Sequence, residues 1–222
     1  EPLVDDALSR QLAIDAPVRV LEICDFGTQG LSGGVDPTSD QGNFVRFFFD
    51  IGIPHTGGSD GGTYGYGRSS LYLAGRTRTI LVDTQVHGGG DATRRMMACR
   101  LGAAYVKPRL GGSQNRYTGR HFWGGHAQDN TILPLEGEPA RSLAASLGMP
   151  ARDIGNSGTS ILIPWPDLPD VDTGRHISAA LLHNLWPKLV EVQGRRPMEI
   201  AVEIDGVSVP IPDPKRHHQY AP

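Results

Sequence analysis

The stretch Asp60–Gly75, DGGTYGYGRSSLYLAG, carries four glycines in its first eight residues and none in the next seven. The change from glycine-rich to more apolar sequence predicts a helix that begins after Gly67. A loop of this kind before a helix N-terminus is suited to binding an anion, because free backbone N–H groups and the helix dipole point outward there. The alternative is an ordinary surface turn, in which the glycines only relieve backbone strain.

Three common glycine motifs do not fit this part of the chain. Residues 62–69, GTYGYGRS, have the spacing of a P-loop, but Arg68 replaces the lysine and no strand is predicted before them. The dinucleotide-binding fingerprint fails because Ser70 stands where its third glycine belongs. Gly57–Gly61 spells G-x-S-x-G, but the strand and helix of a nucleophile elbow are not predicted around it.

The composition suits one globular domain or slightly more. The chain has 222 residues, 38% of them hydrophobic, and a net charge of -3 that does not indicate a general nucleic-acid surface. Cys24 and Cys99 lack metal-ligand spacing, so we expect small buried side chains in a reducing compartment. No apolar run is long enough to span a membrane, and the predicted location is cytoplasmic.

Strand and helix patterns are interspersed along the chain, which predicts an α+β fold. Strands are expected at 18–24, 79–84 and 160–163, in the HFW segment near 121–123, and in a hairpin that turns at Asp205-Gly206. Helices are expected from Asn43, which would cap its own helix, from Arg68, from Asp91 through ATRRMMACRL to Gly102, over 138–147, and over 177–187.

Three short motifs follow one another along the chain: DFGTQG from Asp25, GTYGYG from Gly62, and GTSILIP from Gly158. Their order resembles the Bergerat-fold, or GHKL, ATP-binding domain of gyrase-type topoisomerases, MutL proteins, heat-shock chaperones and histidine kinases. That family has D-x-G-x-G at a strand end, G-x-x-G-x-G before a helix, and a threonine at a strand start. The resemblance covers about residues 18–165. The phrases NFVRFF, GGTYGYGRSSLY, PLEGEPARSLAASLGM and GTSILIPWP are similar to bacterial MORC-like ATPases of phage-defence loci.

The resemblance implies a fold and a division of the chain. Residues 1–169 would form a two-layer sandwich of a mixed β-sheet against helices. Residues 170–222 would begin a second, coupling element with a helix and a β-hairpin.

The resemblance also implies an adenine site. Asp25 would accept a hydrogen bond from the exocyclic amino group, which guanine replaces with a carbonyl. Gly27 would leave room for the base and a water molecule, and the hydroxyl of Thr159 would join the same network. As alternatives, a strand-end aspartate is common in turns and a threonine is common in strands.

By the same resemblance, the phosphates would be held by the glycine-rich loop that begins at Gly62. Gly62, Gly65 and Gly67 would let it wrap around them, and the backbone N–H groups of Tyr66, Gly67 and Arg68 would donate to them. The guanidinium of Arg68 would add a charged contact. Residues 56–61 would form a lid over the nucleotide.

Two departures from the family pattern concern the first motif and catalysis. Gln29 stands where the second glycine of the first motif belongs, and Gly30 follows one place late. The family also carries a glutamate that activates water and an asparagine that binds Mg²⁺, both on a preceding helix. Glu1–Leu12 contains no asparagine. We therefore assign no catalytic residue: either this chain begins after that helix, or it is not catalytic.

The predicted cofactors are ATP and, in the full-length protein, Mg²⁺. The expected function is to couple ATP binding and hydrolysis to dimer closure or to an effector protein, in bacterial anti-phage defence. The alternative is a non-catalytic module of the same fold that contacts a partner protein. No metal site is predicted, because His121, His126, His217 and His218 lack ligand spacing. Trp123, Trp165 and Trp186 are expected to anchor the core or an interface rather than to stack on bases.

Overall fold

The chain folds into two compact units, Glu1–Asp167 and Leu168–Pro222. The computed structural model describes residues 17–38, 42–50, 67–108, 112, 114–127, 131–153, 155–169 and 171–216. Gly62, Gly65 and Tyr66 of the predicted phosphate loop, the predicted lid over 56–61, and His217 and His218 lie outside this part of the chain.

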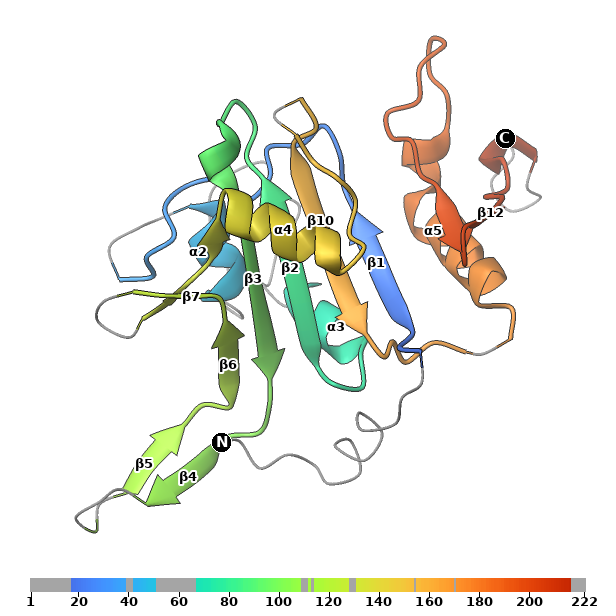
Figure 1. Cartoon of the computed structure of the whole chain (residues 1–222). Coiled ribbons are helices and arrows are strands. Elements are labelled where there is room, and N and C mark those ends of the chain that lie inside the picture. The colour runs from blue at the N-terminus through green and yellow to red at the C-terminus, as the bar shows by residue number, and fades with distance from the viewer. Residues whose placement is uncertain are drawn as a thin grey trace. The chain divides into compact units, whose positions relative to one another are not determined.

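The first unit is built on a six-stranded sheet with the order β1-β10-β2-β3-β6, in which β9 also pairs with β3 (Figure 1). These strands span Val20–Cys24 (β1), Thr79–Gln85 (β2), Arg94–Leu101 (β3), Arg120–Trp123 (β6), Leu135–Glu136 (β9) and Gly158–Pro164 (β10). Two small ribbons accompany the sheet: β4 (Tyr105–Pro108) with β5 (Gln114–Tyr117), and β7 (Gly125–His126) with β8 (Ile132–Leu133).

Helices cover both faces of the sheet (Figure 1). The helices α2 (Asn43–Phe48) and α3 (Gly67–Leu73) lie on one face, and α4 (Glu138–Ser146) lies on the other. A short 3-10 turn, η1 (Asp91–Thr93), joins β2 to β3.

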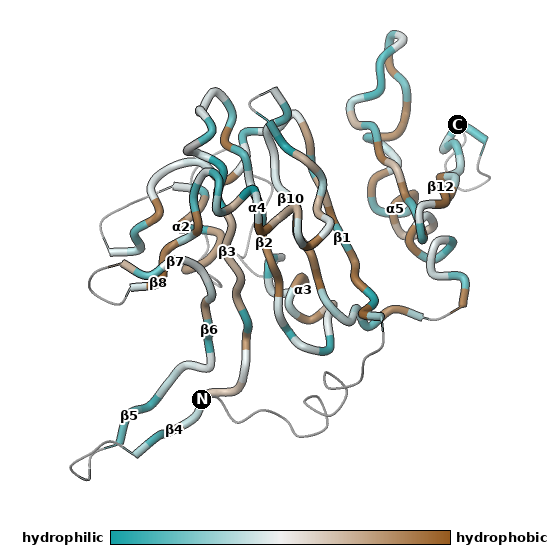
Figure 2. The backbone as a smooth tube through the Cα atoms, viewed as in Figure 1, coloured by the Kyte–Doolittle hydropathy of each residue, from teal (hydrophilic) through white to brown (hydrophobic). Residues whose placement is uncertain are grey.

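The strand alternation divides the apolar side chains between two cores. Successive side chains of a strand point to opposite faces, so neighbouring methionines of β3 enter different cores. Met97 packs with Phe44, Phe48, Tyr72, Ile80, Val82, Cys99 and Ile163 on the α2–α3 face. Met96 packs with Ala140, Ala144, Met149 and Leu162 under α4. Each large buried side chain contributes about 1.5–3 kcal/mol through removal from water, and Figure 2 shows these apolar positions along β2, β3 and β10.

The α+β class is confirmed, but two finer expectations about the sheet are wrong. All pairings among the described residues are antiparallel, whereas a mixed sheet was expected. Short connections such as Val86–Gly90 and η1 return the chain directly beside the strand it has left, which forces antiparallel pairing. Helices on both faces also replace the expected two layers.

The helix predicted from Asp91 to Gly102 is wrong, because this segment forms β3. All seven residues of β2 pair with β3, from Thr79 with Arg100 to Gln85 with Arg94. A strand covered on both faces carries apolar residues at successive positions, so RRMMACRL lacks a clean alternation and its period is ambiguous.

The other predicted elements are confirmed within a few residues. The strands at 18–24, 79–84, 121–123 and 160–163, the helices from Asn43 and Arg68 and over 138–147, and the terminal hairpin are all present. The capping role of Asn43 is wrong: Gly42 holds the N-cap position, and the Asn43 amide donates instead to Ser32 Oγ at 3.4 Å. Cys99 is buried as predicted, whereas Cys24 is half-buried.

The second unit packs a helix against a hairpin. The helix α5 (Thr173–Leu189) is longer than predicted, and β11 (Val202–Ile204) pairs with β12 (Val207–Val209), followed by the turn η2 (Pro214–Arg216). A Cβ added at Gly174 would lie 2.8 Å from Val209 Cγ2, so helix and hairpin touch closely at this glycine. No helix in the described residues has both the length and the apolar character needed to cross a membrane.

The hairpin turn offers a first prediction. Asp205 and Gly206 both have positive φ, at 50° and 77°, as the predicted type I′ turn requires. Replacing Gly206 with alanine should destabilise this unit by about 1–2 kcal/mol, because a Cβ disfavours this backbone conformation. Hydrogen exchange of the β11 and β12 amides measures the loss, and Ser208→Ala on the exposed strand is the matched control. Equal protection in the two variants would contradict the assignment of the turn.

Candidate functional site

Two of the three residues predicted to hold adenine lie side by side at one end of the sheet. Asp25 directly follows β1, and its backbone N–H donates to the carbonyl of Thr159 in β10 at 2.9 Å. Thr159 in turn pairs with Thr84 of β2. Leu21 of β1 packs on the α2–α3 core. Every second side chain of a strand points to the same face, so the Asp25 side chain, four residues later, lies on that face too.

The Asp25 carboxylate is exposed to solvent and oriented from its own loop. The hydroxyl of Thr28 donates to its Oδ1 atom. The backbone N–H of Gly27 donates to the carbonyl of Ser157 at 2.8 Å, which extends the β1–β10 pairing past the strand. Gly27 has a φ of +68°, and a Cβ added there would meet nothing within 4 Å. The predicted third adenine residue therefore borders open space beside the carboxylate.

The hydroxyls of Thr84 and Thr159 form a buried chain behind Asp25. Thr84 Oγ1 donates to the carbonyl of Gly158 at 3.0 Å and accepts from the N–H of Leu31 at 2.9 Å. The two threonine hydroxyls are 3.2 Å apart. Because the single proton of Thr84 goes to the carbonyl, the proton between the two threonines comes from Thr159. This chain holds the Thr159 hydroxyl in one position.

Gly158 is the point at which the site leaves no room for a side chain. Its φ is +141°, and an added Cβ would lie 2.3 Å from the carbonyl oxygen of Asp25 and 2.8 Å from its Oδ1 atom. The same Cβ would lie 2.9 Å from Nη1 of Arg152. Only glycine permits this approach of the strand, the carboxylate and the guanidinium.

Arg152 supports the site from within, and sequence reasoning missed it. The residue is 2% exposed. Its Nη2 donates to the carbonyl of Asp25 at 2.8 Å and to Ser160 Oγ at 2.9 Å, and the guanidinium lies 4.5 Å from the Phe26 ring centroid. Nη1 has no hydrogen-bond partner among the described residues. Burial lowers the pKa of Arg152, while the nearby Cys24 and Asp25 oppose that change.

A buried ion pair holds Arg152 in turn. Arg94 of β3 donates two hydrogen bonds to the carboxylate of Asp83 in β2, from Nε to Oδ1 at 3.0 Å and from Nη2 to Oδ2 at 2.9 Å. Its Nη1 donates to the carbonyl of Arg152 at 2.9 Å. A continuous chain of contacts therefore links Asp83 to the backbone of Asp25. The signal in the sequence was an aspartate at the end of the apolar run TILVD.

Gly30, the displaced second glycine of the first motif, has a structural use. With a φ of +63°, it lies so close to β2 that an added Cβ would be 2.4 Å from the carbonyl oxygen of Gln85. Just beyond it, Nη1 of Arg95 donates to the carbonyls of Leu31 at 3.1 Å and Gly33 at 2.8 Å. These contacts bind the loop after Asp25 to the sheet.

The predicted phosphate site is described only at its C-terminal end. Gly67 and Arg68 begin α3, as expected. Arg68 Nη2 donates to the carbonyl of Asp50 at 2.9 Å, and burial lowers the pKa of this guanidinium. The cation predicted to meet a phosphate is thus engaged with a backbone oxygen in this structure.

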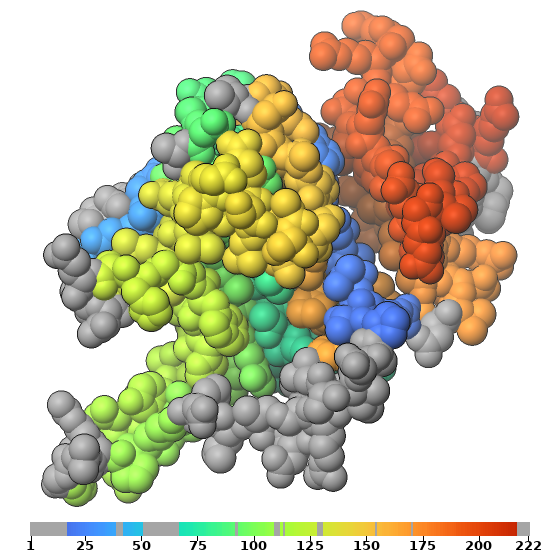
Figure 3. Space-filling model, in the orientation of Figure 1, coloured from blue at the N-terminus to red at the C-terminus, as the bar shows by residue number. Residues whose placement is uncertain are grey.

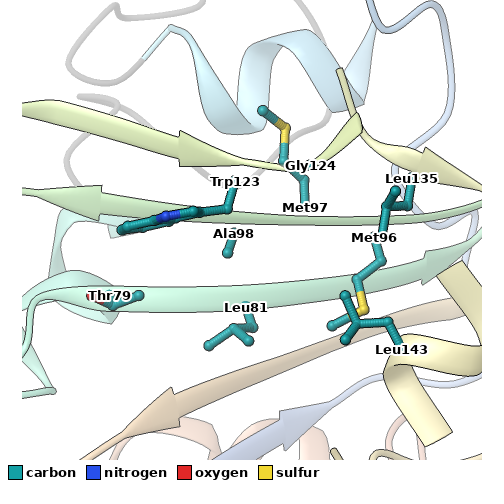
Figure 4. A pocket seen from close by; sticks show the side chains of 9 residues that line it. All are labelled: Thr79, Leu81, Met96, Met97, Ala98, Trp123, Gly124, Leu135 and Leu143. Atoms are coloured by element: carbon teal, nitrogen blue, oxygen red, sulfur yellow. The ribbon is translucent and has the colours of Figure 1, made fainter. Parts of the chain in front are cut away.

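A hollow of about 370 Å³ lies away from these residues, on the face covered by α4 (Figure 4). Leu81, Ala98, Trp123, Leu135 and Leu143 contribute to its apolar wall. None of the predicted site residues that the structure describes lines it, so the hollow is distinct from the corner formed by Asp25, Gly27 and Thr159. Within the described ranges, no cluster of three or more His, Cys, Asp or Glu side chains is placed to hold a metal ion.

Comparison of the chain with protein-family models, curated proteins and solved structures found no match.

Proposed function

We propose that the first unit is an ATP-binding domain of the Bergerat, or GHKL, type, and that Asp25 selects adenine. The observation that carries the proposal is the exposed Asp25 carboxylate beside Thr159, with open space over Gly27. The three residues come from two segments more than 130 positions apart and lie at one end of the sheet, which supports the resemblance.

The chemistry of this corner suits an adenine ring. A carboxylate accepts from the exocyclic amino group of adenine and is repelled by the carbonyl that guanine presents there. The absence of a Cβ at Gly27 leaves room for a flat ring, and the neighbouring Thr159 hydroxyl lies within a fixed hydrogen-bond chain. Arg152 and Gly158 hold the backbone of Asp25 in place, so the acceptor is positioned before the ligand arrives.

The phosphates would meet the segment that leads into α3. The first N–H groups of a helix have no partner within the helix, so those of Gly67 and Arg68, at the start of α3, are of the kind that binds anions. Arg68 would exchange the carbonyl of Asp50 for a phosphate oxygen. Hydrolysis with Mg²⁺, coupling to a dimer or an effector, and a role in anti-phage defence rest on the resemblance. Deletion of the gene in its host with no change in phage sensitivity would count against the last of these.

Calorimetric titration with Mg-ATP and Mg-GTP tests the proposal. We expect ATP to bind more tightly than GTP, and Asp25→Asn to weaken ATP binding by about ten- to hundredfold, because a hydrogen bond to a charged acceptor contributes about 1.5–3 kcal/mol. The matched control is Asp153→Asn, an exposed carboxylate next to Arg152 in the chain, with no atom within 4 Å of a Cβ built at Gly27.

The titrations distinguish an ATPase, a non-catalytic ATP-binding module and a protein without an adenine site. Equal binding of ATP and GTP, or an Asp25→Asn variant that binds ATP as tightly as the wild type, would overturn the adenine site. Selective ATP binding without phosphate release by the full-length protein would identify the non-catalytic form of this fold. Sedimentation of the same samples with and without ATP tests closure of a dimer.

A further inference from the structure

Positive charge is concentrated in one continuous part of the chain. Between Asp91 and Asp129 there is no Asp or Glu, although the whole chain has a net charge of -3. The same interval contains seven basic residues: Arg94, Arg95, Arg100, Lys107, Arg109, Arg116 and Arg120. It forms β3, β4, β5 and β6. Arg94 and Arg95 lie at the Gln85 end of β2, whereas Arg100, Lys107 and Arg116 lie at the Thr79 end and on the ribbon beyond it.

Several of these cations are not neutralised. Arg94 and Arg95 pair with Asp83 and Glu136, and Arg120 donates to the carbonyl of Phe49 at 3.0 Å. In contrast, no carboxylate of the described residues forms an ion pair with Arg100, Lys107 or Arg116. Nε of Arg100 also has no hydrogen-bond partner within the same part of the chain. This surface is suited to a polyanion.

The ribbon of β4 and β5 forms an arm that extends from the sheet (Figure 1). Its base is held by the N–H of Gly102, which donates to the carbonyl of Gly119 at 2.7 Å. Gly119 has a φ of +80°, and an added Cβ would lie 2.4 Å from the carbonyl oxygen of Ala103, so the backbone segments around Gly119 and Ala103 are in close contact there. Figure 2 shows that the arm is mostly hydrophilic. Burial of apolar side chains in the core therefore does not explain why the protein has this arm.

Four rings follow one another in a ladder along this arm and β6; the first three are stacked and the last is tilted. Tyr117 and Tyr105 are stacked with centroids 5.0 Å apart and planes at 11°. Tyr105 and His121 follow at 5.9 Å and 9°, then His121 and Trp123 at 6.5 Å and 35°. Lys107 Nζ lies 6.0 Å from the Tyr105 centroid. The register places Tyr105 opposite Tyr117 and Lys107 opposite Asn115, so these four side chains share one face of the arm.

The two end rings of the ladder are its exposed ones. Tyr117 is 42% exposed and Trp123 is 49% exposed. Trp123 also borders the apolar hollow described above, together with Leu81, Ala98 and Leu143 (Figure 4). A flat ring that stacks on Trp123 would therefore also meet apolar walls. Of the two roles expected for Trp123, an anchor of the core does not account for this exposure, whereas an anchor of an interface does.

We infer that this basic aromatic face, comprising Arg100, Tyr105, Lys107, Tyr117, His121 and Trp123, binds single-stranded nucleic acid. Bases stack on the exposed rings of Tyr117 and Trp123, and phosphates are neutralised by Lys107 and Arg100. Sequence-independent single-strand binders combine these two elements, aromatic platforms and a basic track.

The ring ladder favours unpaired bases over the alternatives. A duplex buries the faces of its bases and would be held by charge alone, and the Asp and Glu side chains of an acidic protein segment have no flat ring to stack. The site is also distinct from the proposed nucleotide site. Asp25 lies where β2 ends, at Gln85, whereas the arm leaves the sheet beside Thr79, where β2 begins.

Fluorescence anisotropy with a labelled oligothymidylate of about twenty nucleotides tests the inference on the whole chain. We expect binding at least about tenfold tighter than to a duplex of the same length, and a steep loss of affinity between about 50 and 200 mM salt. An oligouridylate probe distinguishes DNA from RNA as the source of the same chemistry.

Matched variants separate stacking from charge. Tyr117→Ala and Trp123→Ala should each weaken binding by about ten- to hundredfold, whereas Tyr117→Phe, which keeps the ring, should bind as the wild type does. Lys107→Ala should reduce the salt dependence by about one counterion. The control is Arg175→Ala, an exposed cation of the second unit whose side chain is 83% exposed.

The result that overturns the inference is equally specific. Absence of oligonucleotide binding, equal binding of duplex, equal binding of polyglutamate, or wild-type affinity in both ring-removing variants would each do so. Circular dichroism of every variant shows whether a lost signal comes from a lost fold, and Tyr117→Phe remains informative if the alanine variants unfold.

Discussion

Asp83→Ala is expected to lower the free energy of unfolding of the first unit by about 3–5 kcal/mol. Asp83 is fully buried, and its partner Arg94 is 2% exposed. Removal of the carboxylate leaves the guanidinium of Arg94 buried with no opposite charge, and such a charge costs far more than the pair itself contributes. Because whole domains are stable by only about 5–15 kcal/mol, this single change threatens the fold.

The second partner and an exposed pair provide the controls. The double variant Asp83→Leu with Arg94→Met removes both charges and should recover most of the loss, because apolar groups of similar size often replace a buried pair without cost. Glu136→Ala breaks the Arg95–Glu136 pair, whose carboxylate side chain is 47% exposed, and should cost at most about 1 kcal/mol. Urea unfolding followed by hydrogen exchange of the β2 and β3 amides measures all three. A small loss in Asp83→Ala would show that water reaches Arg94.

Gly158→Ala is expected to abolish detectable ATP binding and to cost about 3 kcal/mol or more of stability. The added Cβ would lie 2.3 Å from the carbonyl oxygen of Asp25, so backbone atoms have to move apart. The φ of +141° adds strain of its own for a residue with a side chain. The displaced atoms are those of Asp25 and Arg152, which is why the affinity should fall further than in Asp25→Asn.

Two other glycines separate strain from site chemistry. Gly27→Ala introduces a Cβ that meets nothing within 4 Å of protein, so it should cost only about 1–2 kcal/mol of stability. It should still weaken ATP binding strongly, because the methyl group occupies the space reserved for the base. Gly148→Ala, after α4, has a similar φ of +73° and open surroundings, and should leave binding unchanged. If Gly27→Ala also bound ATP normally, the base would not lie over Gly27.

The predictable parts of the fold were those with a local cause. The Asp205-Gly206 turn, β1 and β10 carry their own turn chemistry or β-branched residues, and the structure has them where the sequence predicts them. The β3 segment was predicted as a helix because its apolar residues serve two cores at once. Which period applies there depends on α2 and α4, which lie far away along the chain.

The candidate site likewise contains residues that the sequence predicts and residues that it does not. Asp25, Gly27 and Thr159 were recognised through motif order, and the structure brings Asp25 and Thr159 into contact. Arg152 gave no signal, because its role exists only once Ser160 and the backbone of Asp25 surround it. The aromatic ladder could not be predicted from the sequence for a related reason. Tyr105 and Tyr117 become neighbours only through the pairing of β4 with β5.

The pairing of β1 with β10 has a consequence for the order of events during synthesis. Asp25 leaves the ribosome 134 residues before Thr159, to which its backbone binds. At about 5–20 residues per second, β1 waits on the order of ten seconds for its partner strand. Throughout that interval its backbone donors and acceptors have no partner from β10. Slow translation of the residues between these two strands therefore lengthens the time during which β1 can pair with the wrong strand.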